Sequence, residues 1–198
     1  MIFLKKVLVT GAGGSIGINV IKYLLSEGKY EITALDLRNK NSQKRLKRYR
    51  RRINLIYGDM NDSVLMDALV KDQDYIIHLA GLMPPIADIK HNVSEMIDYK
   101  GTENMIKAMN MFNPDAYFIF ASSTTIYGNV KTASTENQPK LTNLDYYSST
   151  KLRIEKMVKE KVKNYTIIRL PLVLTNPKNG SFMYNVKLDS IVEAITDN

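Results

Sequence analysis

The fold is decided by one stretch near the N-terminus, Val7-Leu8-Val9-Thr10-Gly11-Ala12-Gly13-Gly14-Ser15-Ile16-Gly17. An apolar run over residues 2–9 predicts a buried strand, and this run stops at a glycine cluster. The apolar residues after the cluster recur with helical spacing on one face: Ile16, Val20, Ile21, Leu24 and Leu25. A strand, a glycine turn and a helix in this order are typical of the start of a dinucleotide-binding unit.

The glycines of this turn have distinct predicted roles. Gly11 allows the tight turn, Gly14 lets the backbone approach a pyrophosphate, and Gly17 lets the helix pack closely on the strand. An ordinary strand-to-helix turn is also compatible with these glycines, so a second signal is needed. Asp36 supplies it, because it ends the next predicted strand 19 positions after Gly17, where an acid holds the ribose hydroxyls of NAD.

The composition is that of a globular protein of one domain. The 198 residues are 44% hydrophobic, but no apolar run reaches the roughly 18 residues of a membrane span, and the N-terminus lacks a signal-peptide layout. The absence of cysteine excludes disulfides, thiolate metal ligands and cysteine nucleophiles. With only His78 and His91, we also expect no histidine-based metal site. We therefore expect a cytoplasmic protein with no metal and no membrane association.

The net charge of +8 is concentrated in residues 38–52, which hold nine basic residues and no acid. Because nine positive charges lie there, the rest of the chain carries a net charge of −1. We interpret the segment as a solvated loop or short helix near the adenosine end of the site. Attraction of anionic ligands, and contact with nucleic acid or an anionic membrane, are the alternatives. Tyr49 is its only aromatic residue, so we do not expect nucleic-acid binding.

Strand and helix patterns alternate along almost the whole chain. This predicts a doubly wound α/β fold of three layers, in which helices cover both faces of a parallel sheet. The expected strands cover residues 2–9, 31–36, 53–57, 75–80, 116–121 and 165–170. The expected helices cover residues 15–27, 62–71, 91–112 and 146–162, with loops over 81–92 and 122–144 and a helical segment from residue 181. Ligands bind at the carboxyl ends of the strands in such sheets.

Two features near the predicted strand ends carry chemistry. Tyr147 and Lys151 are four positions apart at the start of a predicted helix, so both project from one face. A lysine ammonium beside a tyrosine lowers the phenol pKa from about 10 and prepares a general base. Ser122 and Ser123 follow the fifth predicted strand, where a hydroxyl can hold a substrate oxygen. An amphipathic helix start and simple turn capping are the alternative interpretations.

Four motifs occur in order along the chain. They are Thr10-Gly11-Ala12-Gly13-Gly14-Ser15-Ile16-Gly17, His78-Leu79-Ala80-Gly81, Ser122-Ser123-Thr124-Thr125-Ile126-Tyr127-Gly128 and Tyr147-Ser148-Ser149-Thr150-Lys151. With these motifs the chain resembles the extended short-chain dehydrogenase/reductase family, in its NAD-dependent nucleotide-sugar epimerase/dehydratase branch. The resemblance covers nearly the whole chain. It implies a Rossmann fold, NAD as the cofactor and a nucleotide-sugar as the substrate, and Asp36 disfavours NADP.

The resemblance also implies a role for each matching residue. Ser123 matches the catalytic hydroxyl, Tyr147 matches the catalytic base, and Lys151 matches the lysine that binds the nicotinamide ribose and tunes the tyrosine. The implied cofactor-binding residues are Gly11, Gly14, Ser15, Ile16, Gly17, Asp36, Asp59, Met60, Leu79, Ala80, Gly81, Tyr147, Lys151 and Pro171.

Two departures from the family pattern are visible. The family usually has an asparagine three residues before the Gly-Thr pair of its long helix, where this chain has Asp98. Family members usually continue into a smaller domain that grips the nucleotide-sugar. We therefore expect an NAD-binding Rossmann domain over residues 1–180. Residues 181–198 are expected to be the start or remnant of a C-terminal substrate-binding region that is otherwise largely absent.

The implied reaction is epimerisation through a transient keto-sugar. The Tyr147 phenolate takes a proton from a sugar hydroxyl, hydride passes to the nicotinamide and back, and Ser123 holds the oxygen. Thr124 and Thr125 replace the Asp-Glu pair of the 4,6-dehydratases, and the cysteine of the 3,5-epimerases is missing, so those branches are excluded. An NAD-dependent sugar dehydrogenase and a truncated cofactor-binding protein without turnover remain alternatives.

The family commonly forms dimers through its two long helices, here residues 91–112 and 146–162. A homodimer is therefore expected, although packing of the same side chains on their own sheet is the alternative. The apolar residues that permit the pairing are Tyr99, Met105, Ile106, Met109, Leu152, Ile154 and Met157.

Overall fold

One parallel sheet organises the protein. The computed structural model describes residues 4–128, 134–137, 144–171 and 173. From edge to edge the strands are β3 (Asn54–Tyr57), β2 (Tyr30–Asp36), β1 (Lys5–Thr10), β4 (Tyr75–His78), β5 (Tyr117–Ser123) and β6 (Tyr165–Leu170), and every pair is parallel. The strand order reverses between β1 and β4, and such a switch point is where open α/β sheets bind ligands. The predicted doubly wound sheet is confirmed.

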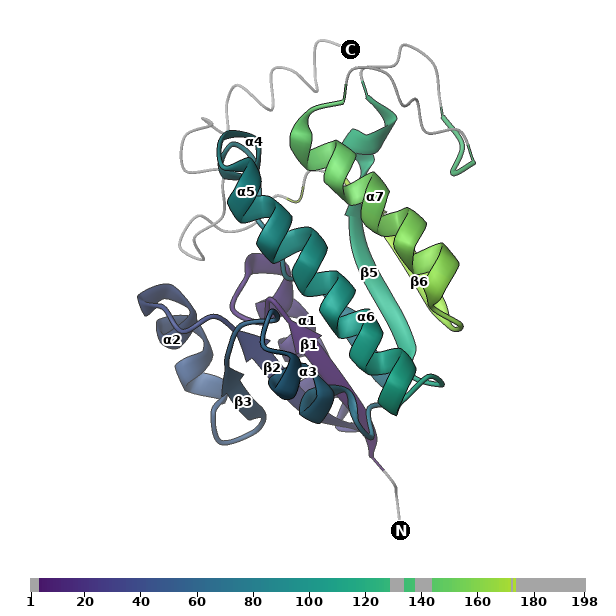
Figure 1. Ribbon diagram of the computed structural model, residues 1–198. Coiled ribbons are helices and arrows are strands. Elements are labelled where there is room, and N and C mark those ends of the chain that lie inside the picture. The colour runs from purple at the N-terminus through teal and green to yellow at the C-terminus, as the bar shows by residue number, and fades with distance from the viewer. Residues whose placement is uncertain (1–3, 129–133, 138–143, 172, 174–198) are drawn as a thin grey trace.

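Helices cover both faces of the sheet (Figure 1). One core joins the sheet to α1 (Ser15–Glu27), α2 (Lys40–Leu46) and the 3₁₀ helix η1 (Lys47–Tyr49). The other core joins it to α3 (Ser63–Val70), α6 (Gly101–Phe112) and α7 (Tyr146–Lys161). Successive strand residues point to opposite faces, so Val7 and Val9 enter the first core whereas Leu8 enters the second. These are the three layers that the alternating pattern predicts.

The basic segment is folded rather than a loose loop. Asn39 caps α2, because its side chain accepts from the N–H groups of Asn41 and Ser42 and the Ser42 side chain accepts from the Asn39 N–H. Leu46 and Tyr49 are buried against the first core, which leaves most of the basic side chains on the opposite, exposed side. The partly helical interpretation of residues 38–52 is therefore confirmed.

Other boundaries differ from the sequence expectation. The expected loop over 81–92 contains α4 (Ile86–Ile89), and α5 (His91–Ser94) also begins within it. The expected long helix over 91–112 consists of α5, the π-helical segment η2 (Glu95–Lys100) and α6. Within it, the Thr102 hydroxyl donates to the Asp98 carbonyl, a side-chain bond that competes with regular helical bonding.

The serines at the predicted end of the fifth strand are part of that strand. β5 continues through Ser122 and Ser123 because these residues pair with Arg169 and Leu170 of β6. The 3₁₀ helix η3 (Thr124–Tyr127) follows directly, so the segment expected as a loop from residue 122 begins as regular structure. The Asp62 cap that begins α3 agrees with its predicted helix, since its side chain accepts from the Leu65 N–H.

Some expectations fall on residues outside the described ranges. The helical segment from residue 181 and the proposed C-terminal remnant, 181–198, belong there. Within the described part of the chain, no helix is both long and apolar enough to cross a bilayer.

Candidate functional site

Two neighbouring cavities lie at the carboxyl ends of the strands, and the sequence-predicted site residues line them. The larger has a volume of about 490 Å³ and extends from the glycine turn to Tyr147, Lys151 and Pro171. The smaller has a volume of about 320 Å³ and includes Asp36 and Asp59. Gly11, Gly14, Leu79 and Gly81 line both cavities. The structure therefore brings all the predicted cofactor-binding and catalytic residues together in one connected region.

The glycine turn has the geometry that its sequence predicts. Gly11 has a positive φ of 63°, which favours glycine. A Cβ at Gly11 would lie 2.7 Å from the Ala80 nitrogen, so the turn after β1 and the loop after β4 approach too closely for a side chain. A Cβ at Gly17 would collide with the Gly11 carbonyl, so only glycine lets α1 start this close to β1. Gly14 caps α1 without any side-chain hydrogen bond, and the first N–H groups of a helix that lacks such a cap are available to an anionic ligand.

Asp36 is fixed on this turn. Its carboxylate accepts a 2.6 Å hydrogen bond from the Gly13 N–H, and Arg45 donates from Nη1 to the Gly13 carbonyl at 2.6 Å. Burial raises the pKa of Asp36, whereas the Gly13 and Leu37 N–H groups and the Arg45 charge oppose the shift. The acid that the sequence predicts to hold the ribose is thus fixed at the smaller cavity by the backbone of the glycine turn.

The described residues fit a dinucleotide. The two cavities follow one another across the switch point, and the glycine turn lies between the Asp36 side and the Tyr147 side. The uncapped start of α1 offers N–H donors at this junction, as a diphosphate requires. A dinucleotide with its adenosine near Asp36 and its reactive ring near Tyr147 therefore matches the donors that this chain presents.

The pKa of Tyr147 is shifted in the opposite direction from the sequence expectation. Burial raises it to about 12, and a hydrogen bond with the Ser123 side chain opposes the shift. The phenol hydroxyl lies 3.6 Å from Met83 Sδ, on the loop after β4. The Lys151 Nζ makes no hydrogen bond to the phenol oxygen and donates to the Ala121 carbonyl at 3.0 Å. The expectation of a net lowering of the Tyr147 pKa is wrong for this structure, because burial outweighs the opposing contributions.

Lys151 lies in a buried and partly acidic environment. Burial lowers the pKa of its ammonium, and the negative charges of Asp98 and Glu155 counteract that shift. Asp98 accepts from the Leu82 N–H at 2.7 Å and from the Ser94 hydroxyl at 2.5 Å, and burial raises its own pKa. Asp98 stands where the family usually has an asparagine. It places an ionisable carboxyl group beside Lys151, whereas the amide of an asparagine would carry no charge.

A buried ion pair between Arg169 and Glu155 lies beside strand residues that line the larger cavity. The sequence patterns did not predict this pair. Arg169 on β6 donates from Nη2 to Glu155 Oε2 at 2.7 Å and from Nε to Oε1 at 3.0 Å, and the Ser122 hydroxyl donates to the same Oε1 at 2.6 Å. Arg169 also donates to the Tyr127 hydroxyl at 2.8 Å. This network ties β5, β6 and α7 together directly behind Ser123.

His78 is a core residue rather than a ligand to a metal. Its ring nitrogens share hydrogen bonds of 2.8 Å with the hydroxyls of Thr10 and Thr102, and burial lowers its pKa to about 3. The ring also stacks on Phe120. Among the described residues, no cluster of histidine and acidic side chains has the arrangement of a metal site.

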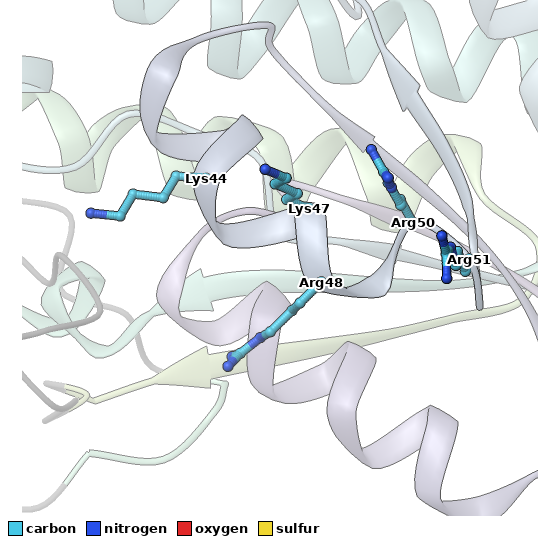
Figure 2. A pocket seen from close by; sticks show the side chains of 5 residues that line it. All are labelled: Lys44, Lys47, Arg48, Arg50 and Arg51. Atoms are coloured by element: carbon cyan, nitrogen blue, oxygen red, sulfur yellow. The ribbon is translucent and has the colours of Figure 1, made fainter.

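Most of the basic segment lies outside these cavities. Figure 2 shows five of its side chains around a separate surface hollow of about 450 Å³, lined by Lys44, Lys47, Arg48, Arg50 and Arg51. Among the basic residues of the segment, Arg45 is the exception, because it lines the larger cavity beside the glycine turn. Sequence reasoning missed Arg45, since composition marks the whole segment as basic without showing which helix face meets the site.

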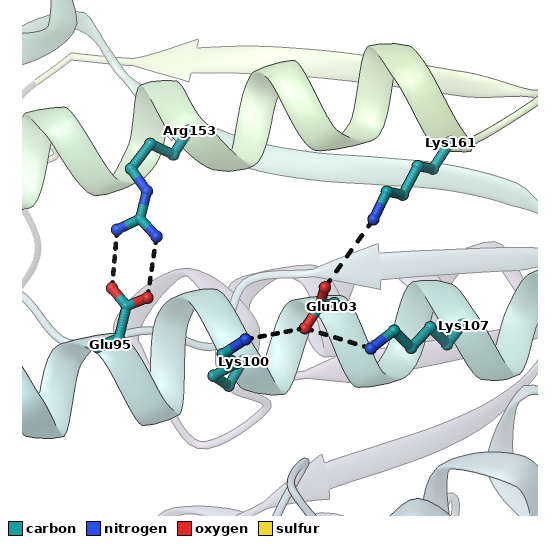
Figure 3. Close-up of polar contacts among 6 residues, drawn as sticks. All are labelled: Glu95, Lys100, Glu103, Lys107, Arg153 and Lys161. Carbon is teal, nitrogen blue, oxygen red and sulfur yellow. Dashed lines mark hydrogen bonds and ion pairs between the residues drawn. The ribbon is translucent and has the colours of Figure 1, made fainter.

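Both ion pairs and exposed apolar side chains lie on the surface of the long helix pair. Figure 3 shows Glu95 of η2 bonded to Arg153 of α7 through two hydrogen bonds of 2.8 and 2.9 Å, and Glu103 of α6 between three lysines. Of the apolar residues expected to permit dimerisation, five are buried in the protein's own core: Met105, Ile106, Met109, Ile154 and Met157. Their packing on the sheet is the alternative that the structure supports.

Comparison with known proteins identifies relatives of this arrangement. A family model described as the NAD-dependent epimerase/dehydratase family matches residues 7–193. UDP-glucose 4-epimerase 3 of Oryza sativa subsp. japonica is 30% identical over 160 residues, which are 75% of this chain and 42% of that protein. The dTDP-glucose 4,6-dehydratase of Mycolicibacterium smegmatis is 28% identical over 174 residues, which are 82% of this chain and 50% of that protein.

A solved structure agrees with these matches. The UDP-glucose 4-epimerase from Bifidobacterium longum, in complex with NAD⁺ and UDP, superposes with a TM-score of 0.72 at 25% identity. The match covers 83% of this chain and 52% of that one. The chain thus spans about half the length of the relatives that it matches.

Proposed function

Because this chain belongs to the NAD-dependent epimerase/dehydratase family, we propose that it binds NAD and epimerises a nucleotide-sugar through a transient keto-sugar. One observation carries the proposal. The glycine turn, Ser123, Tyr147 and Lys151 line a single cavity, so cofactor and acid/base chemistry share one space. This chain spans about half the length of its relatives. That the chain is active by itself is therefore also a proposal.

Tyr147 is the proposed base. Its phenolate would accept the proton of a sugar hydroxyl. Bound NAD would supply the acceptor for the hydride that leaves the carbon bearing this hydroxyl. Ser123 is the group proposed to hold the sugar oxygen, because it lines the same cavity as Tyr147 and its side chain opposes the rise in the Tyr147 pKa. The raised pKa of Tyr147 means that base function near neutral pH needs additional positive charge beside the phenol. Lys151 and the cationic nicotinamide ring are the groups proposed to supply it.

The position of the lysine supports this proposal. Lys151 Nζ lies 5.7 Å from the centre of the Tyr147 ring and is held by the Ala121 carbonyl on β5. Both residues are on the first turns of α7, which begins at its Asp145 cap. With NAD bound, Lys151 would be the residue that holds the cofactor ribose, and its charge would stabilise the phenolate of Tyr147.

Epimerisation is favoured over elimination by the residues after Ser123. Thr125 uses its hydroxyl to bond with Ser123 at 2.9 Å, and it accepts from the Ser148 hydroxyl at 2.8 Å. Neither Thr124 nor Thr125 supplies a carboxyl group for acid/base elimination. The remaining alternatives are an NAD-dependent sugar dehydrogenase, which would release an oxidised product, and a cofactor-binding protein without turnover.

One experiment separates these possibilities. The purified chain is incubated with NAD and a panel of UDP-, dTDP- and GDP-sugars, and both NADH absorbance and sugar products are followed. An epimerase interconverts two sugar nucleotides without net NADH, whereas a dehydrogenase accumulates NADH in proportion to product. Tyr147→Phe is the matched control, because it removes only the proposed basic oxygen. NAD binding without any product in either assay would exclude turnover and leave the cofactor-binding alternative.

A homodimer and a cytoplasmic location remain part of the proposal. The exposed side of the pair formed by residues 91–112 and 146–162 carries ion pairs together with exposed apolar side chains such as Met96 and Met111, so a two-fold interface there would be of mixed character. Light scattering of the purified chain tests the dimer directly. A mass that stays at 22.6 kDa over a wide concentration range would exclude it.

A further inference from the structure

One cation of the basic segment faces away from the others. Lys44, Lys47, Arg48, Arg50 and Arg51 surround a separate surface hollow, whereas Arg45 lines the larger cavity together with Gly14 and Ser15. The Asn39 cap sets the start of α2, and Leu46 anchors its end in the core. Between these anchors, the helix directs Arg45 toward the glycine turn.

The contact between α2 and the turn is close. A Cβ at Gly13 would lie 3.0 Å from the Asp36 carboxylate and 3.1 Å from Ser42, so α2 packs on the turn at a point that favours glycine. There the Arg45 Nη1 donates to the Gly13 carbonyl at 2.6 Å. The guanidinium is therefore held by backbone at the place where the two cavities meet.

The same guanidinium has an unused donor. Within the described residues, Nη2 of Arg45 is buried and has no hydrogen-bond partner. A charged donor that is buried without an acceptor is costly, so such groups in native proteins normally have a partner. The carboxylate of Asp36, whose pKa the Arg45 charge lowers, accepts from the Gly13 N–H and makes no hydrogen bond with Arg45. An anion over the glycine turn would supply the missing acceptor.

We propose that Arg45 is a phosphate-binding residue of this site, which adds a charge-assisted hydrogen bond to the diphosphate of the bound dinucleotide. This inference rests on the proposed binding of NAD. Arg45 lines the cavity of the glycine turn and Tyr147, and it does not line the adenosine cavity that contains Asp36 and Asp59. Its position therefore favours the diphosphate over a 2′-phosphate on the adenosine ribose. The planar fork can donate to Gly13 and to a phosphate oxygen at the same time.

Calorimetric titration with NAD tests the assignment with three variants. Arg45→Gln removes the charge, Arg45→Lys keeps the charge without the fork, and Arg48→Gln removes an exposed charge three residues away. We expect Arg45→Gln to weaken NAD binding about tenfold or more, Arg45→Lys to be intermediate, and Arg48→Gln to change it less than about twofold. Thermal unfolding shows that each variant is folded.

Salt dependence separates ligand contact from a structural role. If Arg45 contacts the diphosphate, the dissociation constant of Arg45→Gln rises less steeply with ionic strength than that of the wild type. A folded Arg45→Gln variant with wild-type affinity, or with weaker affinity and an unchanged salt slope, would overturn the inference. A loss confined to NADP would also overturn it, because it would assign Arg45 to the 2′-phosphate. Failure of the wild-type chain to bind NAD would instead reject the proposed function, and this inference with it.

Discussion

The Asp36 carboxylate accepts a 2.6 Å hydrogen bond from the Gly13 N–H, so the acid that ends β2 is attached to the glycine turn that follows β1. The two predicted halves of the cofactor site are therefore one structural unit. A change at Asp36 is therefore expected to affect both the proposed ribose contact and the backbone donor that Asp36 fixes.

Asp36→Asn is expected to weaken NAD binding by about tenfold, because it removes a charged acceptor for the ribose hydroxyls. NADP binding should weaken less or improve, since the negative charge that repels a 2′-phosphate is gone. Fluorescence or calorimetric titration with both cofactors measures the ratio. An unchanged preference between NAD and NADP would show that Asp36 does not face the ribose. Asp67→Asn, on α3 and outside both cavities, is the matched control.

The pKa of the Tyr147 phenol is expected to fall when NAD binds. Burial raises its pKa to about 12, so without cofactor the phenolate forms only in strong alkali. Bound NAD is expected to lower that value, because the nicotinamide ring is cationic. Turnover should rise with pH until the phenolate is fully formed, and Tyr147→Phe should lose turnover by about 10²-fold or more while keeping its affinity for NAD. An ultraviolet difference titration between wild type and Tyr147→Phe measures the pKa, and an unshifted value with NAD would contradict the proposed role.

Arg169→Met is expected to lower the free energy of unfolding by about 3–5 kcal/mol, because it leaves the Glu155 carboxylate buried without its partner. Adding Glu155→Leu to that variant should restore part of the loss. Urea unfolding measures both changes. The exposed pair of Lys156 and Glu160 provides the comparison, and Lys156→Met should cost less than about 1 kcal/mol. Equal effects at the buried and exposed pairs would contradict the buried network.

His78 makes stability depend on pH. Its pKa falls from 6.5 to about 3 on folding, because the neutral ring is buried between two threonine hydroxyls. Its contribution is fully present above pH 6.5 and is lost as the pH falls from 6.5 toward 3, at up to about 1.4 kcal/mol per pH unit. The difference in unfolding free energy between wild type and His78→Gln should therefore shrink between pH 7 and pH 4. A constant difference would mean that the ring is not buried in its neutral form.

Local patterns in the sequence predict much of this protein. The glycine turn and the alternation of strand and helix patterns depend on spacing alone, so the sheet and the positions of Gly11, Asp36 and Tyr147 could be foreseen. The environment of Tyr147 could not, because it depends on how Met83 and its loop cover the phenol. The direction of Arg45 likewise depends on the cap and packing of α2.

Apolar spacing on the long helices was also ambiguous. Met105 and Ile154 fit either a dimer interface or the protein's own core, and only the packed structure shows that both are buried inside. Asp98 was recognised as a departure from the family pattern. Its proximity to Lys151 depends on the π-helical segment η2, which no spacing rule predicted.

The central claim is that the glycine turn holds NAD, and Gly14 offers the most direct test. Its φ of −66° suits any residue, and an added Cβ would meet only the Gly11 carbonyl, at 3.0 Å. Gly14→Val should therefore fold while its side chain occupies the space of the diphosphate. Calorimetry should show one NAD site per wild-type chain and no binding to a folded Gly14→Val. Absence of NAD binding to the wild type, or equal binding to both proteins, would contradict the claim.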